Sequence, residues 1–148
     1  MGLKVKDVAL GDYHTVALTD DGNVWTWGYG GKKGLFNWMY SQDVGALGHG
    51  DKEPSFIPKK VQFFEENDIK VKQVEAGLYH CNVLTEDDQL YTWGRGLYGV
   101  LGNGSNHYSL TPILNESIEG VKEESDPPSS IVKMSSTDEM TAILMSNG

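Results

Sequence analysis

An internal repeat constrains this sequence more than any other feature. Val5–Gly30 and Val71–Gly96 agree at 13 of 26 aligned positions, and both copies contain the dipeptide Trp-Gly near their ends. A third copy starts at Ile131 and reaches Gly148, at the point where the first copy has Gly22. Because self-similarity at a fixed spacing is the signature of repeat architectures, we interpret the chain as units of one kind packed side by side.

Each copy is expected to contain an antiparallel hairpin. In the first copy, the β-branched and apolar run Thr15–Leu18 precedes a turn, and Val24–Trp27 alternates between two faces. Gly22 suits the turn because glycine adopts a positive φ without steric cost. The segment Ser55–Phe64 can supply an outer strand, since its Pro58 is tolerated at a sheet edge.

Short antiparallel units at a spacing of roughly 50–65 residues favour radial repetition of small sheets around an axis. We therefore predict an all-β fold of β-propeller blades, a partial propeller of antiparallel sheets spanning 1–148. The first repeat is expected at about 3–68, the second at about 69–128, and the start of the third at 129–148. The acidic, proline-containing stretch 115–130 has the composition of a solvated loop between blades.

The segments "GDYHTVALTDDGNVWTWGYG" and "GLYHCNVLTEDDQLYTWGRGLYGVLGNGS" resemble repeats of the RCC1 family. Its unit runs G-x-x-H, a strand, L-T-x-x-G, a strand ending in W-G, and a closing L-G-x-G. The positions that carry the structural motif are Gly11, His14, Trp27, Gly28, Gly77, His80, Trp93, Gly94, Leu101 and Gly102. The resemblance implies a seven-bladed propeller, so the remaining blades are expected in the same chain or in another one.

The copies also differ in informative ways. Asp88 replaces the turn glycine in the second copy, and Met140 replaces the motif histidine in the third. The first copy carries about twelve residues between Gly31 and Gly45 that the second copy lacks. The matching tryptophans, Trp27 and Trp93, are nevertheless expected to occupy equivalent environments.

Composition excludes several classes of function. The net charge of −9 disfavours direct binding to a nucleic-acid backbone. No apolar run approaches the roughly 18 residues of a membrane span. A single cysteine, Cys81, rules out an internal disulfide framework and favours an intracellular setting, with cytoplasm, nucleus and mitochondrion all left open.

The motifs that suggest enzyme chemistry fail on inspection. The G-x-G-x-x-G pattern from Gly94 to Gly99 is followed by a sequence that cannot open a helix, which disfavours a dinucleotide site. The histidines lack the close spacing of a zinc site, so no metal or cofactor is expected. His14 and His80 are predicted to be structural, with their imidazoles hydrogen-bonded to backbone and Tyr13 and Tyr79 packing beside them. Cys81 is predicted to be a small packing residue.

Three functions remain open, and none of them makes this chain an enzyme. The first is a non-catalytic protein–protein interaction module or structural subunit of a larger assembly. The second, implied by the resemblance, is a guanine-nucleotide exchange factor for a small GTPase, with Asp12, His14 and His80 as the matching positions. The third is a domain that regulates an attached enzyme.

The extra residues of the first copy are the predicted partner contact. They include Phe36, Trp38, Met39 and Tyr40, side chains of the types enriched where proteins meet. The alternative is that this loop folds back and caps its own propeller.

Overall fold

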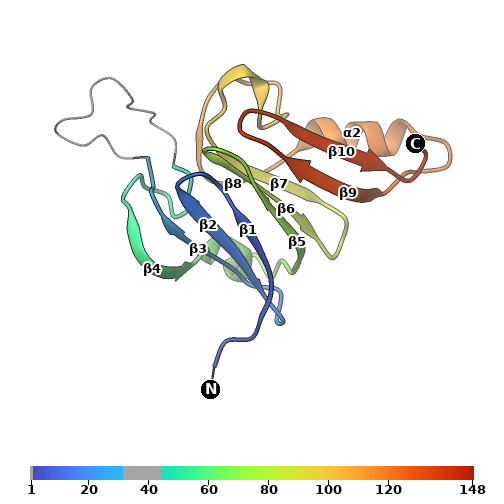
Figure 1. Cartoon of the computed structure of the whole chain (residues 1–148). Coiled ribbons are helices and arrows are strands. Elements are labelled where there is room, and N and C mark those ends of the chain that lie inside the picture. Colours follow the sequence, from blue (N-terminus) through green and yellow to red (C-terminus); the bar gives the residue numbers. More distant parts are fainter. Residues whose placement is uncertain (1, 32–44) are drawn as a thin grey trace.

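The computed structural model describes residues 2–31 and 45–148, and in them the chain forms three antiparallel sheets (Figure 1). The first sheet contains β1 (Val5–Leu10), β2 (His14–Thr19), β3 (Val24–Gly28) and β4 (Ser55–Lys60), paired in chain order. The second contains β5 (Val71–Ala76), β6 (His80–Thr85), β7 (Leu90–Gly94) and β8 (Ser109–Leu114), again in chain order. The third is a hairpin of β9 (Ile131–Ser136) and β10 (Thr141–Met145). The predicted blades of antiparallel strands are confirmed.

The two complete sheets share one register. His14 pairs with Gly28 and His80 pairs with Gly94 at the matching point of each sheet. In the outer strands, Gly28 pairs with Ser55, and Gly94 pairs with Ser109. The glycines are 66 positions apart and the serines 54, so the first sheet accommodates about twelve additional residues before β4 without a change in pairing.

Consecutive sheets contact one another through their first strands. β1 contacts β5 and β5 contacts β9, so the first strand of each sheet lies beside the first strand of the next (Figure 1). A hydrophobic core fills the boundary between the first two sheets and includes Val16, Val74, Phe64 and Trp93. Phe64 is fully buried, with its ring centroid 6.0 Å from that of Trp93. We call this the first boundary; the second lies between β5–β8 and the β9–β10 hairpin.

Two segments differ from their predicted conformation. The predicted outer strand ends at Lys60, and Gln62–Glu66 forms the short helix α1, which places Phe64 in the core. The predicted loop 115–130 contains the helix α2 (Glu116–Glu124). Asn115 caps α2 by accepting a hydrogen bond from the Ile118 amide, and acidic residues occupy its first turn. The prolines that suggested a loop lie beyond the end of the helix, where they do not oppose it.

Neither helix is long and apolar enough to cross a membrane, and no other candidate span occurs among the described residues.

Candidate functional site

The motif histidines lie in the boundaries between sheets. His14 is 3% exposed, and its Nε2 is 3.1 Å from Sγ of Cys81 in the neighbouring sheet. The Cys81 thiol in turn donates a hydrogen bond to the carbonyl oxygen of Ala46 at 3.4 Å. A histidine on the first sheet is thereby joined, through a side chain of the second, to a loop that returns to the first.

The second boundary repeats this arrangement. Nε2 of His80, which is 1% exposed, lies 3.1 Å from Oγ1 of Thr141. Thr141 donates to the carbonyl oxygen of Val100 at 3.4 Å. The Nε2 partners of both histidines are side chains of the next sheet. A hydrogen bond with the His80 backbone also acts on the pKa of His14, so the prediction that these imidazoles bond to backbone stays a prediction. The small polar residues Thr15, Cys81 and Thr141 at one repeat position are the sequence signal that could have indicated these partners.

The motif glycines leave space for these contacts. A Cβ atom on Gly11 would overlap both the His14 ring and the carbonyl oxygen of Gly77 in the next sheet. A Cβ on Gly77 would overlap the His80 ring and the carbonyl oxygen of Thr137 in the same way. The G-x-x-H spacing therefore has a packing explanation: glycine admits both the imidazole and the neighbouring backbone.

Burial fixes the protonation of these groups. It lowers the pKa of His14 to about 4, with the nearby His80 as a second cause, and it lowers the pKa of His80 to about 4. Burial also raises the pKa of the Cys81 thiol well above its ordinary value. At neutral pH both imidazoles are therefore uncharged and Cys81 is a thiol rather than a nucleophilic thiolate. This arrangement suits packing, as predicted for Cys81.

The two matching tryptophans occupy different environments, so that prediction is wrong. Trp93 is fully buried at the first boundary, where its Nε1 donates to the Ala46 carbonyl at 3.0 Å. Gly48 lies so close to the Trp93 indole that a side chain there would overlap it. Trp27 is only half-buried, because the described residues place no further sheet against its side of β1–β4.

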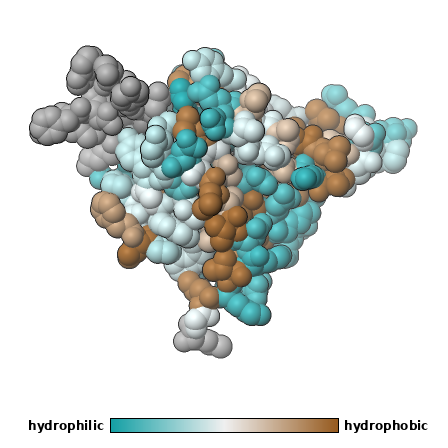
Figure 2. Space-filling view, in the orientation of Figure 1, coloured by the Kyte–Doolittle hydropathy of each residue, from teal (hydrophilic) through white to brown (hydrophobic). Residues whose placement is uncertain are grey.

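The same flank of the first sheet exposes apolar side chains. Val8 is 49% and Leu10 73% exposed, whereas the equivalent Val74 and Ala76 of the second sheet are 3% and 8% exposed. In Figure 2 a hydrophobic band runs over β1, the edge strand with which this sheet begins. Val8 and Leu10 thus occupy the positions that Val74 and Ala76 use to pack at the first boundary, but in the described part of the chain no sheet covers them.

The closing L-G motif supplies acceptors to its own sheet. The carbonyl oxygen of Leu101 accepts hydrogen bonds from Thr92 Oγ1 at 3.2 Å and from Asn115 Nδ2 at 2.9 Å. Gly102 has a φ of 63° and lies beside the Asn115 amide, where a side chain would be crowded. Leu101 and Gly102 therefore hold the outer loop against β7.

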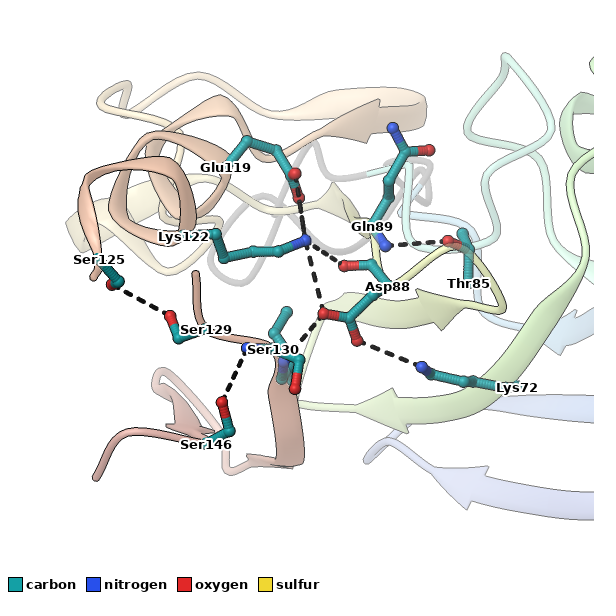
Figure 3. Close-up of polar contacts among 11 residues, drawn as sticks. Lys72, Thr85, Asp88, Gln89, Glu119, Lys122, Ser125, Ser129, Ser130 and Ser146 are labelled. Atoms are coloured by element: carbon teal, nitrogen blue, oxygen red, sulfur yellow. Dashed lines mark hydrogen bonds and ion pairs between the residues drawn. The ribbon is translucent and has the colours of Figure 1, made fainter. Parts of the chain in front are cut away.

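Asp88, identified in the sequence only as a departure from glycine, connects three elements (Figure 3). Its carboxylate lies 3.2 Å from Nζ of Lys72 on β5 and 3.6 Å from Nζ of Lys122 on α2. It also accepts a hydrogen bond from the Ile131 amide at the start of β9, at 3.0 Å. Lys122 donates to the Asp88 carbonyl as well, at 2.6 Å, and pairs with Glu119. The turn of the second sheet is thereby fastened to α2 and to the third sheet.

The remaining predicted site residues are dispersed. Asp12 is exposed in the turn between β1 and β2, whereas its neighbour His14 is buried. Phe36, Trp38, Met39 and Tyr40 lie outside the described residues. Within the described ranges, no group of three or more histidine, cysteine or acidic side chains is arranged to hold a metal ion.

Comparison with known proteins places these features in a family. Two models of the regulator of chromosome condensation (RCC1) repeat match the chain, one over residues 5–33 and 71–100 and the other over 41–84 and 87–144. The ultraviolet-B receptor UVR8 of Arabidopsis thaliana is 40% identical over 121 residues, which cover 82% of this chain and 24% of the receptor. The human E3 ubiquitin-protein ligase HERC2 is 37% identical over 123 residues, 82% of this chain and 2% of the ligase.

A solved structure shows the same fold. Saccharomyces cerevisiae Prp20p, described with its binding properties to Gsp1p and histones, superposes with a TM-score of 0.69 at 20% identity, over 96% of this chain and 31% of Prp20p. The chain thus spans about a quarter of UVR8, under a third of Prp20p and a small fraction of HERC2.

Proposed function

Because this chain belongs to the RCC1-repeat family, we propose that it is a non-catalytic interaction or structural module that binds a protein partner through the loops of its blades. The observation that carries the proposal is the position of His14 and His80. Both are buried in boundaries between sheets and bonded to the next sheet, so neither imidazole is presented to a partner. With these imidazoles buried, the loops between strands are the groups that we propose for recognition.

The apolar flank of β1 supports a companion proposal about assembly. Val8 and Leu10 need a covering surface like the one that buries Val74 and Ala76. We propose that another RCC1-type blade, in the same polypeptide or in a partner, packs on this flank and brings a motif histidine to Thr15. The repeats themselves are proposed at about 3–68, 69–128 and from 129.

Exchange of guanine nucleotide on a small GTPase is the second candidate. Asp12 supports it as the one of the three matching positions that is exposed. The Prp20p structure is described with binding to Gsp1p, but at 20% identity its likeness supports the fold rather than the partner. Regulation of an attached enzyme has weaker support, because the alignment with HERC2 covers only 2% of that ligase.

A combined experiment tests these functions. The intact protein carrying an affinity tag is cross-linked in its native cells, and the cross-linked peptides are mapped onto its loops. A reproducible partner cross-linked to the loops supports the module, and the absence of any such partner contradicts it. Nucleotide release from purified small GTPases is measured in parallel. Release that is stimulated by the intact protein, lost in Asp12→Ala and retained in Asp20→Ala would favour exchange activity instead.

The extra residues of the first copy require a separate test. We propose Phe36, Trp38, Met39 and Tyr40 as partner contacts on the chemistry of their side chains. Trp38→Ala should abolish association at unchanged thermal stability. A large loss of stability with binding intact would instead support the alternative that these residues cap the propeller.

A further inference from the structure

Three tyrosines, an arginine and a glutamate form a continuous ladder at one end of the sheets. The ladder consists of Tyr13, Tyr29, Tyr79, Arg95 and Glu139. Its members come from two repeat positions: the residue before the motif histidine, or its counterpart Met140, and the residue after Trp-Gly. They therefore lie near the turns between β1 and β2, β5 and β6, and β9 and β10, at the upper end of the sheets in Figure 1.

The ladder crosses both boundaries. Tyr13 and Tyr79 are stacked at 5.6 Å between ring centroids, and Tyr29 approaches both edge-on at 6.3 and 6.4 Å. On the second sheet, the guanidinium of Arg95 lies over the Tyr79 ring at 5.9 Å and pairs with Glu139 at 3.2 Å. The ladder thus already contains one cation on a tyrosine ring, Arg95 on Tyr79, with the Glu139 carboxylate paired to that cation.

The ladder leaves polar and aromatic groups open to a partner. Tyr13 remains 58% exposed despite its two ring contacts, and the adjacent Asp12 is exposed. The Asp12 carboxylate is close enough to contribute to raising the pKa of Tyr79, after burial and the neighbouring tyrosines. Tyr13 therefore presents an accessible ring that is next in the chain to the exposed carboxylate of Asp12.

A groove adjoins the other end of the ladder. It has a volume of about 590 Å³ and shares Glu139 with the ladder. Its lining combines Leu78, Tyr98 and Met140 with the acidic Asp138, and Tyr98 and Met140 are 79% and 68% exposed. Among the described residues named for the ladder, the groove and the adjacent turn, the carboxylates of Asp12, Asp138 and Glu139 outnumber the cation Arg95. The chain as a whole carries a net charge of −9.

We infer that this surface, the ladder with its groove, docks an arginine- or lysine-containing segment of a protein partner, with a cationic side chain on Tyr13 beside Asp12. The inference rests on the proposed interaction function and specifies the chemistry of the partner. A cation over an aromatic face is attracted by the ring quadrupole, and the excess of carboxylates gives the surface the complementary charge. The same charge disfavours nucleic acid and anionic membrane as occupants.

The test uses the intact protein and fluorescent twelve-residue glycine-serine peptides that carry three arginines, three lysines, three glutamines or three glutamates. We expect the arginine and lysine peptides to bind and the other two to bind far more weakly. Tyr13→Leu, which keeps apolar bulk without the ring, should weaken binding about fivefold. Asp12→Asn should also weaken it, and the effect of Asp12→Asn should shrink at high salt.

Matched controls separate this surface from general attraction to an acidic protein. Asp20→Asn removes the same charge from the opposite end of β2, and Tyr108→Leu removes another exposed tyrosine that has a lysine over its ring. Both should leave peptide binding unchanged. Should Tyr13→Leu fail to fold, Asp12→Asn decides the question alone, since Asp12 is an exposed turn residue.

Two results would overturn the inference. One is equal binding of arginine and glutamine peptides; the other is equal weakening by the control variants and by Tyr13→Leu or Asp12→Asn. A partner found by cross-linking that still binds both site variants would refute this surface while leaving the interaction function intact. Absence of any loop-bound partner would refute the function itself.

Discussion

Nε2 of His14 and Sγ of Cys81 lie 3.1 Å apart across the boundary between two sheets. They belong to neighbouring repeats and are 67 positions apart in the chain. The same relationship joins His80 to Thr141, so the residue after His80, or after its counterpart Met140, contacts the histidine of the preceding repeat. The motif is thus completed only when two blades pack together.

Stability should fall as the pH is lowered from 6.5 toward 4. In the folded chain the pKa of each of His14 and His80 is about 4, against 6.5 when exposed, so unfolding takes up protons in this range. Their contribution is fully present above the unfolded pKa and is lost as the pH falls toward the folded one. We expect a loss of about 2 kcal/mol per histidine between pH 7 and 5, measured by urea unfolding. His14→Gln should flatten this dependence, whereas exposed His107→Gln should leave it unchanged.

A hydroxyl should replace the thiol of Cys81 better than a methyl group does. Threonine occupies the matching positions 15 and 141, and valine has nearly the same shape without the hydrogen-bonding group. Cys81→Thr should therefore be more stable than Cys81→Val by about 1 kcal/mol. Equal unfolding free energies for the two variants would show that the contact with His14 contributes nothing.

The Cys81 thiol should resist labelling in the folded protein. It is fully buried and its pKa is raised, so the reactive thiolate forms only when the boundary opens. An aromatic disulfide reagent should react at the rate of unfolding or local opening and rapidly in urea. Rapid reaction of the folded protein at neutral pH would contradict the buried position.

Adding a methyl group to Gly77 should separate the second and third sheets. Gly77→Ala would press on the His80 ring and on the Thr137 carbonyl, and a cost of about 3 kcal/mol is expected. Gly120→Ala is the matched control, because no atom lies within 4 Å of the added Cβ and the position is inside α2. That change should stabilise the chain by up to about 1 kcal/mol, and thermal unfolding of both variants gives the comparison.

Removing the Asp88 side chain should weaken the attachment of α2 and β9. Asp88→Ala leaves Lys122 and the Ile131 amide without this acceptor, at a cost of about 2 kcal/mol. Asp88→Gly should cost about 1 kcal/mol less than Asp88→Ala, because φ at this position is 63° and glycine relieves the strain. Denaturant unfolding measures both.

Asp68→Gly provides the control for that comparison. Asp68 also has a positive φ, 54°, but it is exposed and does not belong to the Asp88 network. The change should therefore be neutral or stabilising. If Asp88→Gly behaves like Asp68→Gly, the contacts of Asp88 do not contribute to stability.

The repeat and its turn glycines were enough to predict the sheets. Gly22 has a φ of 77° at the turn where the sequence requires it, and the two copies share their register. Local pattern governs these features, since strand alternation and turn chemistry are encoded within a few residues.

Contacts between repeats were not predictable in the same way. The partners of His14, the buried state of Trp93 against half-buried Trp27, and the links made by Asp88 all depend on which neighbour covers each position. The helix α2 was not predicted, because the two prolines beyond its end made the whole stretch resemble a loop, although Asn115 is a favourable N-cap. The tyrosine ladder joins residues that look like ordinary packing positions until the sheets are placed side by side.

Gly28 pairs with Ser55 as Gly94 pairs with Ser109, although the two connections differ in length. The pairing of strands within a blade therefore does not depend on the length of this connection. A dozen residues can be gained between the third and fourth strands while every partner in the outer pairing is retained. This junction is therefore a place where a blade tolerates change, open to natural diversification and to the grafting of a foreign peptide by design. A binding specificity introduced there would be carried by a scaffold that need not be rebuilt to receive it.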